Sequence, residues 1–418
     1  MTARSQTSVQ TLPLAGVRVV EFSHMVMGPT CGMILGDLGA EVIKVEPLSG
    51  DNTRRLIGTG AGFFRMFNRN KKSVAVDLAD PGGREAVARL IASADVLIEN
   101  FKPGTMAKYG LDYPMLAARH PRLIYVAHKG FLPGPYEHRT ALDEVVQMMA
   151  GLAYMTGPIG RPLRAGTSVN DIMGGMFGAI GVLAALRARE QTGRGQEVQA
   201  ALFENCVLLA GQHMQQYAVT GEAPQPMPSR ISAWGIYDVF EDKNGEQIFL
   251  GVVSDTQWKI FCDAFGLREL AGDPRVATNN QRVLARDWLI ARLQEIFRKY
   301  TVSELQDLFE ANALPYAPIV RPEQLFEDPH LGGSGGLATL TTETGEETKV
   351  PLLPLTLDGE RLPPRRPLPS IGEDTAEVLR GLGYGEREIE ALQNQGAIGG
   401  GRVGESGERA APTSSASR

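Results

Sequence analysis

The sequence is poor in the residue types that build disulfide frameworks and metal sites. Its 418 residues include only three cysteines, Cys31, Cys206 and Cys262, which lie far apart, and six histidines without metal-ligand spacing. The absence of a CxxC pair or a dense cysteine pattern is typical of a chain kept in a reducing compartment. We therefore expect a cytoplasmic protein with no structural or catalytic metal.

Positive charge and long apolar runs are also scarce. The formal net charge is -6 and the pI is near 5.7, which argues against wide surfaces for nucleic acid or anionic membranes but leaves space for a small basic pocket. The longest uncharged apolar run, residues 172–186, is short and glycine-rich for a membrane span, and the N-terminus lacks the apolar core of a signal peptide. We expect neither nucleic acid nor a membrane as a partner.

Two common catalytic signatures are missing as well. The first predicted strand is followed by SHMVMGP, which has one glycine where the dinucleotide-binding GxGxxG needs three. The stretch GTSVN around Ser168 lacks the second glycine of the GxSxG elbow found in serine hydrolases. Both an NAD-dependent dehydrogenase and an α/β-hydrolase are disfavoured.

The sequence does contain a regular alternation of short apolar strands and amphipathic helices. We predict strands over 16–23, 40–47, 72–79, 95–101 and 121–131, with helices over 81–94 and 112–120. This alternation indicates an α/β fold with a parallel, Rossmann-like sheet, in which ligands bind beyond the carboxyl ends of the strands.

Composition divides the chain into segments. Residues 1–225 are predicted to form the first part of the large domain, and a proline-rich connection then leads to a smaller α+β domain over 226–330. Residues 331–398 return to complete the large domain. The tail, 399–418, is too polar to bury a core and is predicted to be disordered.

The stretch VNDIMGGMFGAIGVLAAL places one carboxylate, Asp171, before fifteen uncharged residues that include four glycines. An aspartate there is typical of a helix N-cap. Each glycine inside a helix costs on the order of 0.8–1 kcal/mol relative to alanine, so four cost roughly 3 to 4 kcal/mol. We infer that another backbone packs closely on this helix or that a ligand needs the space beside Asp171.

Basic residues gather near the predicted strand ends. The run FRMFNRNKKS contains Lys71, ENFKPGTMAKYG contains Lys102 and Lys108, and AHKGF contains Lys129. Each run taken alone is more typical of a solvated loop than of a site. Their shared placement favours a cradle for phosphate groups, because lysine and arginine both donate to phosphate oxygens.

Taken together, the motifs resemble those of the family III CoA-transferases. The segments MGPTCGMILGDLGAEVIKVEP, NRNKKSVAVDL, ADVLIENFKPGTM, PRLIYVAHKGF, VNDIMGG, QTGRGQ, DPHL and LPSIGEDT occur in that family's order and spacing, over roughly residues 12–398. The family includes formyl-CoA transferase and carnitine CoA-transferase and is related to α-methylacyl-CoA racemase. The resemblance implies two ring-like subunits interlocked as a homodimer, with coenzyme A as a substrate and no tightly bound cofactor.

The resemblance also implies a set of site residues. The family's nucleophilic aspartate matches Asp171, which attacks the acyl-CoA thioester and carries CoA as an aspartyl thioester, while nearby backbone N–H groups stabilise each oxyanion. The residues that match the family's CoA-binding positions are Val26, Met27, Asn70, Lys71, Asn100, Phe101, Lys102, Lys108 and Lys129.

Three departures from the family pattern bear on which substrates and which reaction we expect for this chain. The four-glycine loop of formyl-CoA transferase is absent, and Val26 stands where that enzyme has glutamine, so formyl-CoA and oxalate are doubtful substrates. The racemase histidine lies in a GHD motif whose counterpart here is Ala141-Leu142-Asp143, with His138 four positions before Leu142. The family's GEHT is GEDT, with Asp374 in place of histidine.

We therefore predict an acyl-CoA:carboxylate CoA-transferase, with succinyl-CoA as donor and a small dicarboxylic acid as acceptor. The alternatives are a racemase of the α-methylacyl-CoA type and a non-catalytic CoA-binding protein. The basic residues expected near the acyl group, each more typical of a structural or surface position, are Arg139, Arg164, Arg230, His24 and His128.

Overall fold

The computed structural model describes residues 12–342 and 344–400. They fall into two compact units, one made of residues 12–222 with 332–400 and the other of residues 223–331. Residues 401–418, most of the tail predicted to be disordered, lie outside the described part of the chain. The first two tail residues are described, and the N–H of Gly399 donates to the carbonyl of Ala75 at 2.9 Å.

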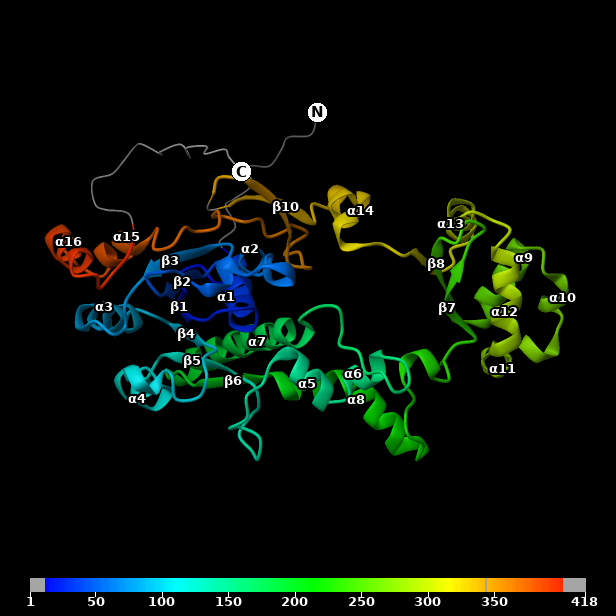
Figure 1. The fold of residues 1–418 in the computed structure, drawn as a ribbon, viewed down its shortest axis with the longest axis horizontal. Helices are drawn as coiled ribbons and strands as arrows, with labels where there is room; N and C mark the ends of the chain where they lie inside the picture. The colour runs from blue at the N-terminus through cyan, green and yellow to red at the C-terminus, as the bar shows by residue number, and fades with distance from the viewer. Residues whose placement is uncertain (1–11, 343, 401–418) are drawn as a thin grey trace, which may run out of the picture. The chain divides into compact units, whose positions relative to one another are not determined.

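The larger unit is built on a six-stranded sheet in which every neighbouring pair is parallel (Figure 1). In spatial order the strands are β3 (Lys71–Ala75), β2 (Glu41–Glu46), β1 (Arg18–Phe22), β4 (Val96–Glu99), β5 (Ile124–Lys129) and β6 (Glu197–Ala201). The predicted α/β fold with a parallel sheet is confirmed. The strand order reverses between β1 and β4, and a ligand crevice is expected at that point.

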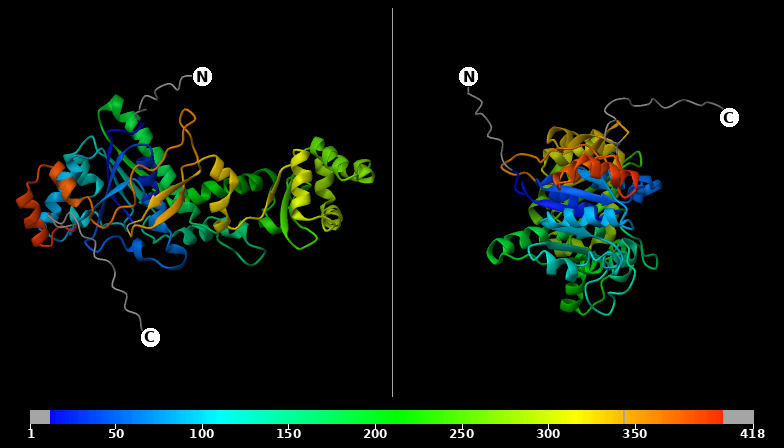
Figure 2. Two further views of the ribbon diagram at one scale, coloured as in Figure 1. Left: turned by 90° about the horizontal axis from the view of Figure 1, so that it is seen from above. Right: turned by 90° about the vertical axis from the view of Figure 1, so that its left-hand side faces the viewer.

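Helices cover both faces of this sheet, because successive side chains of each strand point to opposite faces. On one face, Val20 and Phe22 of β1 pack with the helices α3 (Pro81–Ala92), α4 (Tyr113–Arg119), α15 (Thr375–Gly381) and α16 (Glu386–Asn394). On the other face, Val19 packs with α1 (Met27–Asp37) and α7 (Val169–Thr192). The red C-terminal helices lie on the same side as α3 in both sets of views (Figure 2).

The glycines of α7 are explained by how closely this helix packs. A Cβ on Gly175 would lie 2.6 Å from the carbonyl oxygen of Met27 in α1, and a Cβ on Gly178 would lie 2.4 Å from the ring of His128 in β5. Close packing of a neighbouring backbone, one of the two explanations inferred from the sequence, holds for Gly175, while Gly174, Gly178 and Gly181 face side chains of neighbouring elements. Within the described residues, α7 is also the one helix long and apolar enough to cross a membrane by length and composition, a test that core helices also pass.

The larger unit has further elements beyond the six-stranded sheet and the helices that cover it. They are α2 (Phe63–Phe67), α5 (Asp143–Met149), α6 (Leu152–Thr156), α8 (Leu202–Thr220) and the antiparallel hairpin β10 (Leu337–Thr341) and β11 (Glu347–Pro351). Strand β6 and helices α5, α6 and α8 were not predicted from the sequence. The N-terminal half of β6 is polar, so its apolar pattern is too short to distinguish it from a loop.

The smaller unit has its own antiparallel sheet and apolar core. Its strands are β7 (Ile236–Glu241), β8 (Gln247–Val252) and β9 (Tyr316–Pro318), and its helices are α9 (Asp255–Ala264), α10 (Arg268–Ala271), α11 (Asn279–Leu284), α12 (Arg286–Phe297) and α13 (Val302–Ala311). A cluster of buried aromatic rings, Phe240, Phe261, Phe297 and Phe309, forms the centre of its core. Helix α14 (Pro329–Gly333) contains the point where the chain passes back to the larger unit.

Candidate active site

The crevice expected between β1 and β4 is closed at its base by one asparagine. The side chain of Asn100, just after β4, accepts the backbone N–H of His24 at 3.0 Å and donates to the His24 carbonyl at 2.8 Å. The rings of His24 and Phe101 stack with centroids 5.6 Å apart. Asn100 and Phe101 therefore join the loops that follow two neighbouring strands, at the position where the sequence predicts ligand contacts.

The loop after β1 is held in a conformation that most side chains avoid. Met25 has a φ of 64°, in the left-handed region, and its N–H donates to the hydroxyl of Thr53 at 2.9 Å. Thr53 in turn donates to the carboxylate of Asp51 at 2.7 Å. Left-handed non-glycine residues persist where surrounding contacts enforce them, and they gather at functional sites.

Beneath this loop lies a cluster of fully buried charges. Lys71 donates to Glu21 at 2.9 Å and to the carbonyl of Pro29 at 3.0 Å. Lys44 pairs with Asp51 at 3.0 Å and donates to the carbonyl of Ser23 at 2.6 Å. Burial lowers the pKa of Lys71 to about 8. These groups fix the loop from below and offer no charge to solvent.

Four of the residues predicted to contact CoA therefore have their side chains in the protein interior. Lys71 is fully buried in its pair with Glu21, and the side chain of Asn70 bonds Asp37 and the backbone N–H groups of residues 365 and 366. Val26 and Met27 are buried in separate apolar clusters. The phosphate-cradle interpretation of the 64–73 run is wrong for Lys71, because a buried ammonium already paired with a carboxylate is not free for a phosphate.

The other three lysines behave differently. Lys102 and Lys108 are exposed beyond the end of β4. Lys129, at the end of β5, pairs with Glu99 at 3.1 Å and remains 27% exposed. Lys102 and Lys129 line one cavity of about 200 Å³ at the carboxyl ends of β4 and β5. The structure thus brings two of the predicted cations together where the fold expects a ligand.

Asp171 lies in the first turn of α7 but does not cap it. The N-cap position is occupied by Ser168, whose side chain makes no capping bond, and Asp171 is the third residue of the helix. The capping acceptor is instead Asp143, the first residue of α5, whose Oδ2 accepts the N–H of Asn170 at 2.7 Å and that of Asp171 at 3.1 Å. The N-cap interpretation of Asp171 is wrong, and its side chain is not used to close the helix.

The environment of Asp171 makes its carboxylate unusually basic. Burial, together with the negative charge of Asp143, raises the pKa of Asp171 to about 7, while Arg164 acts in the opposite direction. A more basic carboxylate is a stronger nucleophile, and near neutral pH both its ionised and its neutral forms are populated. Asp171 is therefore equipped to attack a carbonyl carbon.

The backbone N–H groups at the start of α7 are already bonded. Val169 donates to the carbonyl of Thr167 at 2.9 Å, Asn170 and Asp171 donate to Asp143, and Ile172 donates to the carbonyl of Ser168 at 3.0 Å. These backbone N–H groups are therefore not free to receive an incoming negative charge in this structure. Oxyanion stabilisation has to come from other groups.

The five basic residues expected near the acyl group lie in different environments. His128 is buried and burial lowers its pKa to about 3, while the guanidinium of Arg139 lies 5.1 Å from the ring centre of Tyr136. Arg230 belongs to the smaller unit, and His24 stacks on Phe101. Arg164 is the member of this set whose charge acts on Asp171.

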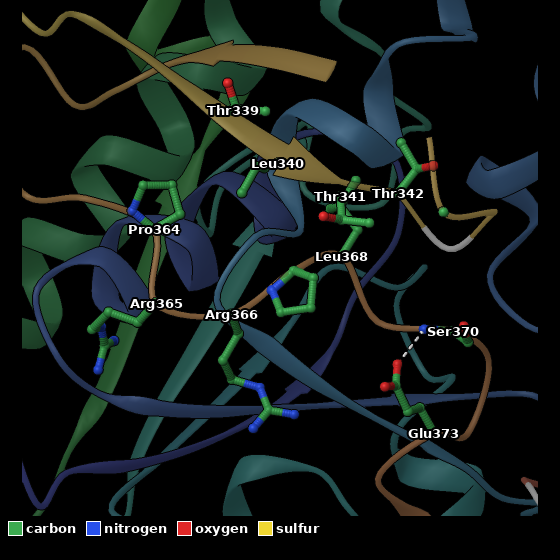
Figure 3. A pocket seen from close by; sticks show the side chains of 12 residues that line it. Thr339, Leu340, Thr341, Thr342, Pro364, Arg365, Arg366, Leu368, Ser370 and Glu373 are labelled. Carbon is green, nitrogen blue, oxygen red and sulfur yellow. Dashed lines mark hydrogen bonds between the residues drawn. The ribbon is translucent and has the colours of Figure 1, made fainter. Parts of the chain in front are cut away.

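One large cavity in the larger unit does not contain the nucleophile candidate. It measures about 750 Å³ and lies between the β10–β11 hairpin and residues 364–373 (Figure 3). Its guanidinium groups are already bonded, Arg365 to the carbonyl of Gly36 and Arg366 to Asp374 at 2.5 Å. None of the predicted site residues lines it.

Asp143 and Gln147 were not predicted as site residues. The amide of Gln147 donates to Oδ1 of Asp143, and its carbonyl oxygen accepts the N–H of Ala165 at 2.8 Å. The bond to Ala165 spans 18 residues and those from Asn170 and Asp171 to Asp143 span 27 and 28, separations that no local spacing reveals. The signal that was available is Asp143 itself, which retains the aspartate of the racemase-type GHD triplet.

Comparisons with known proteins identify the family. The model of CoA-transferase family III matches residues 14–375. The chain belongs to CoA-transferase family III. It is 36% identical over 389 residues to a succinate–glutarate CoA-transferase of Agrobacterium fabrum, covering 90% of this chain and 97% of that relative.

Other members of family III give the same assignment. The chain is 33% identical to the beta subunit of a succinyl-CoA–L-malate CoA-transferase of Chloroflexus aurantiacus, covering 93% of this chain and 98% of that relative. Among solved structures, a CAIB/BAIF family protein of Brucella suis superposes with a TM-score of 0.79 at 33% identity, covering 89% of this chain and all of that one. The chain is a family III CoA-transferase.

In the GEDT segment, Asp374 places a carboxylate where the family pattern has a histidine. Asp374 accepts the backbone N–H of Ser73 at 2.9 Å with one oxygen and the guanidinium of Arg366 with the other. The carboxylate that replaces the family's histidine is therefore matched by a cation eight residues earlier. This pairing accounts for how a negative charge is accommodated at a buried position.

Proposed function

We propose that this protein moves CoA from succinyl-CoA to a small dicarboxylic acid through an aspartyl-CoA thioester on Asp171. The observation that carries the proposal is the state of Asp171: a carboxylate at the start of α7, released from capping by Asp143 and with its pKa raised to about 7. Support for the acids comes from relatives named for succinate, glutarate and malate. The acetyl-CoA:oxalate CoA-transferase of Acetobacter aceti, 36% identical over 74% of this chain, extends the acids of the relatives to a shorter dicarboxylate.

The proposed reaction has two halves, and the second half reverses the steps of the first with a different acid. An oxygen of ionised Asp171 attacks the thioester carbon of the donor, the C–S bond breaks, and CoA leaves as a thiolate while a mixed anhydride forms. The thiolate then attacks Cγ of Asp171, which releases the donor acid and leaves the aspartyl-CoA thioester. The acceptor carboxylate reverses these steps, so that Asp171 is regenerated and a new acyl-CoA is released.

The conservation of thioester energy sets two demands on the site. Water must be excluded while the anhydride exists, because hydrolysis would waste the thioester. CoA must also stay bound between the two attacks, and the exposed Lys102 and Lys108 with the partly exposed Lys129, all near the strand ends, are suited to hold its phosphates. We assign CoA binding to these three lysines with Asn100 and Phe101.

We further propose that the active form is a homodimer whose subunits interlock. An exposed apolar stripe on α7 supports a protein partner, since large apolar side chains rarely gather on the surface of a monomer. The stripe consists of Met176, Phe177, Ile180 and Leu183. Sedimentation of the purified protein against an Ile180→Asp variant tests the dimer; a wild-type monomer at micromolar concentration would contradict it.

The test of the reaction is mass spectrometry of the intact protein and its peptides after mixing with succinyl-CoA. We expect an adduct of the mass of CoA on the peptide that contains Asp171, removed by adding glutarate and absent in Asp171→Asn. If no adduct forms and solvent deuterium enters beside the thioester carbonyl, the protein is instead a racemase. An adduct that persists in Asp171→Asn would sink the assignment of the nucleophile.

A further inference from the structure

The segment before α7, residues 157–168, carries a charged residue close to the nucleophile candidate. This segment folds back on itself, since a Cβ on Gly157 would lie 2.0 Å from the carbonyl oxygen of Arg161. The N–H of Leu163 donates to the carbonyl of Ala153 at 3.0 Å. The backbone on both sides of Arg164 is therefore fixed.

Arg164 is anchored to the same pair of residues that holds Asp171. The N–H of the next residue, Ala165, donates to Gln147 at 2.8 Å. Gln147 donates to Asp143, and Asp143 accepts the N–H of Asp171 at 3.1 Å. A continuous chain of hydrogen bonds thus fixes the backbone beside Arg164 relative to the nucleophile.

The guanidinium of Arg164 has a partner that a substrate can replace. It pairs with Glu144, and both side chains remain exposed, at 40% for Arg164 and 46% for Glu144. An ion pair this exposed contributes little to stability, so exchanging one carboxylate for another costs little. The planar guanidinium binds carboxylates through two parallel N–H donors, a geometry suited to the free end of a dicarboxylic acid.

The other cations near the strand ends and loops of this unit are less suited to this task. Lys71 is buried against Glu21, and Lys129 pairs with Glu99 beside the cavity assigned to CoA. Arg139 lies over the ring of Tyr136. The hydrogen bonds that link Ala165 through Gln147 and Asp143 to Asp171 place the backbone of Arg164 near the start of α7.

We propose that Arg164 binds the distal carboxylate of the acceptor acid in place of Glu144, and so selects dicarboxylates over monocarboxylates. The inference rests on the proposed function, because it takes Asp171 as the residue that carries CoA. In the absence of substrate, the guanidinium of Arg164 pairs with Glu144, and the distal carboxylate of the acceptor replaces Glu144 when it binds. Arg164 is thus a specificity residue and takes no part in bond making.

The experiment compares two five-carbon acceptors, glutarate and pentanoate, with saturating succinyl-CoA as donor. The kcat/KM ratio for the two acids is the readout, because both react with the same aspartyl-CoA thioester and any effect on Asp171 itself cancels. Arg164→Met should lower the glutarate-to-pentanoate ratio by roughly 10- to 100-fold, the size expected for losing a charged hydrogen bond. The loss should appear mainly in the KM for glutarate.

Two further variants give an independent readout and a control for the loss of an exposed cation. Glu144→Gln removes the competing carboxylate and should lower the KM for glutarate, which gives an independent readout if Arg164→Met folds poorly. Arg161→Met removes an exposed cation of the same segment and should leave the ratio within about twofold of wild type.

The outcomes distinguish this inference from the proposed function. If the wild type transfers CoA to both acids and Arg164→Met keeps the wild-type ratio, the role of Arg164 is overturned while the transferase stands. A wild type that does not prefer glutarate also overturns it. If the wild type forms no aspartyl-CoA adduct and uses neither acid, the proposed function fails first, and the inference fails with it.

Discussion

The carboxylate of Asp143, in α5, accepts the backbone N–H of Asp171 at 3.1 Å, so a second acidic side chain lies at the first turn of α7. At the start of α7, one aspartate caps the helix and a different aspartate is the nucleophile candidate. Asp143 satisfies the open donors of α7, and Asp171 keeps its own oxygens free. The proximity of two negative charges also raises the pKa of Asp171, so the cap prepares the nucleophile.

The raised pKa predicts that Asp171→Asn stabilises the protein while abolishing CoA transfer. The folded-state pKa, about 7, lies above the value of an unfolded aspartate, so ionisation of Asp171 opposes folding at pH 8. Asparagine removes that charge, and we expect a gain on the order of 1–3 kcal/mol in the free energy of unfolding. The gain should fade as the pH falls from 7 towards 4, where wild-type Asp171 is protonated in the folded state.

Urea unfolding of both proteins at pH 8 and at pH 4.5 measures this difference. A stability difference that stays constant between the two pH values would mean that Asp171 is not the titrating group.

Removing the charge of Asp143 should move the pH profile of the reaction. Asp171 attacks only when ionised, so kcat/KM falls on the acid side with the pKa of Asp171. Asp143→Asn keeps the shape of the cap but removes the negative charge, which lowers the pKa of Asp171. We therefore expect the acid limb of kcat/KM to shift to lower pH, with a lower plateau because the nucleophile is less basic.

Glu190→Gln is the matched control for this profile. Glu190 is an exposed acid near the far end of α7, and its loss should leave the acid limb in place. A profile that does not move in Asp143→Asn, with transfer still measurable, would separate Asp143 from the ionisation of the nucleophile.

The burial of Lys71 predicts a loss of stability rather than a loss of phosphate binding. Lys71→Met leaves Glu21 buried without its 2.8 Å partner, and breaking a buried pair in this way costs about 3 kcal/mol. The double variant Glu21→Gln with Lys71→Met should recover part of that loss. Thermal unfolding checks both, and Lys102→Met should raise the KM for succinyl-CoA more than Lys71→Met does. The reverse order would restore Lys71 as a contact to CoA.

The sequence predicted the parallel sheet because short runs rich in β-branched residues, within 18–22, 41–46 and 124–129, alternate with amphipathic helical stretches. It missed β6, whose first residues, Glu197 and Gln199, are polar and partly exposed. Helices α5 and α8 were missed too, because their exposed apolar residues blur the pattern of one apolar and one polar face.

The candidate site could be predicted only as far as chemistry follows from residue type and motif. Asp171 stood out because it is a single carboxylate before an uncharged helix. The directions of the side chains could not be predicted: Lys71 looks like Lys102 in sequence, and only the fold sends one into the core and the other to the surface. The pairing of Asp143 with residues 27 and 28 positions later depends on tertiary structure in the same way.

The glycines of α7 give a last prediction, which separates close packing from helix propensity. Gly175→Ala adds a methyl group 2.6 Å from the carbonyl oxygen of Met27 and 2.5 Å from Cβ of Thr30. The backbone of α1 cannot yield as a flexible side chain would, so we expect overpacking to cost about 2–3 kcal/mol. Gly211 in α8 offers the control, since a Cβ there meets nothing within 4 Å.

Gly211→Ala should raise the free energy of unfolding by about 0.5–1 kcal/mol, because alanine loses less conformational entropy in a helix. The opposite signs of the two substitutions, measured by urea unfolding under the same conditions, would show that the α1–α7 contact needs the missing side chain. If Gly175→Ala were also stabilising, α7 could move away from α1, and the first turn that carries Asp171 would not be held by this packing.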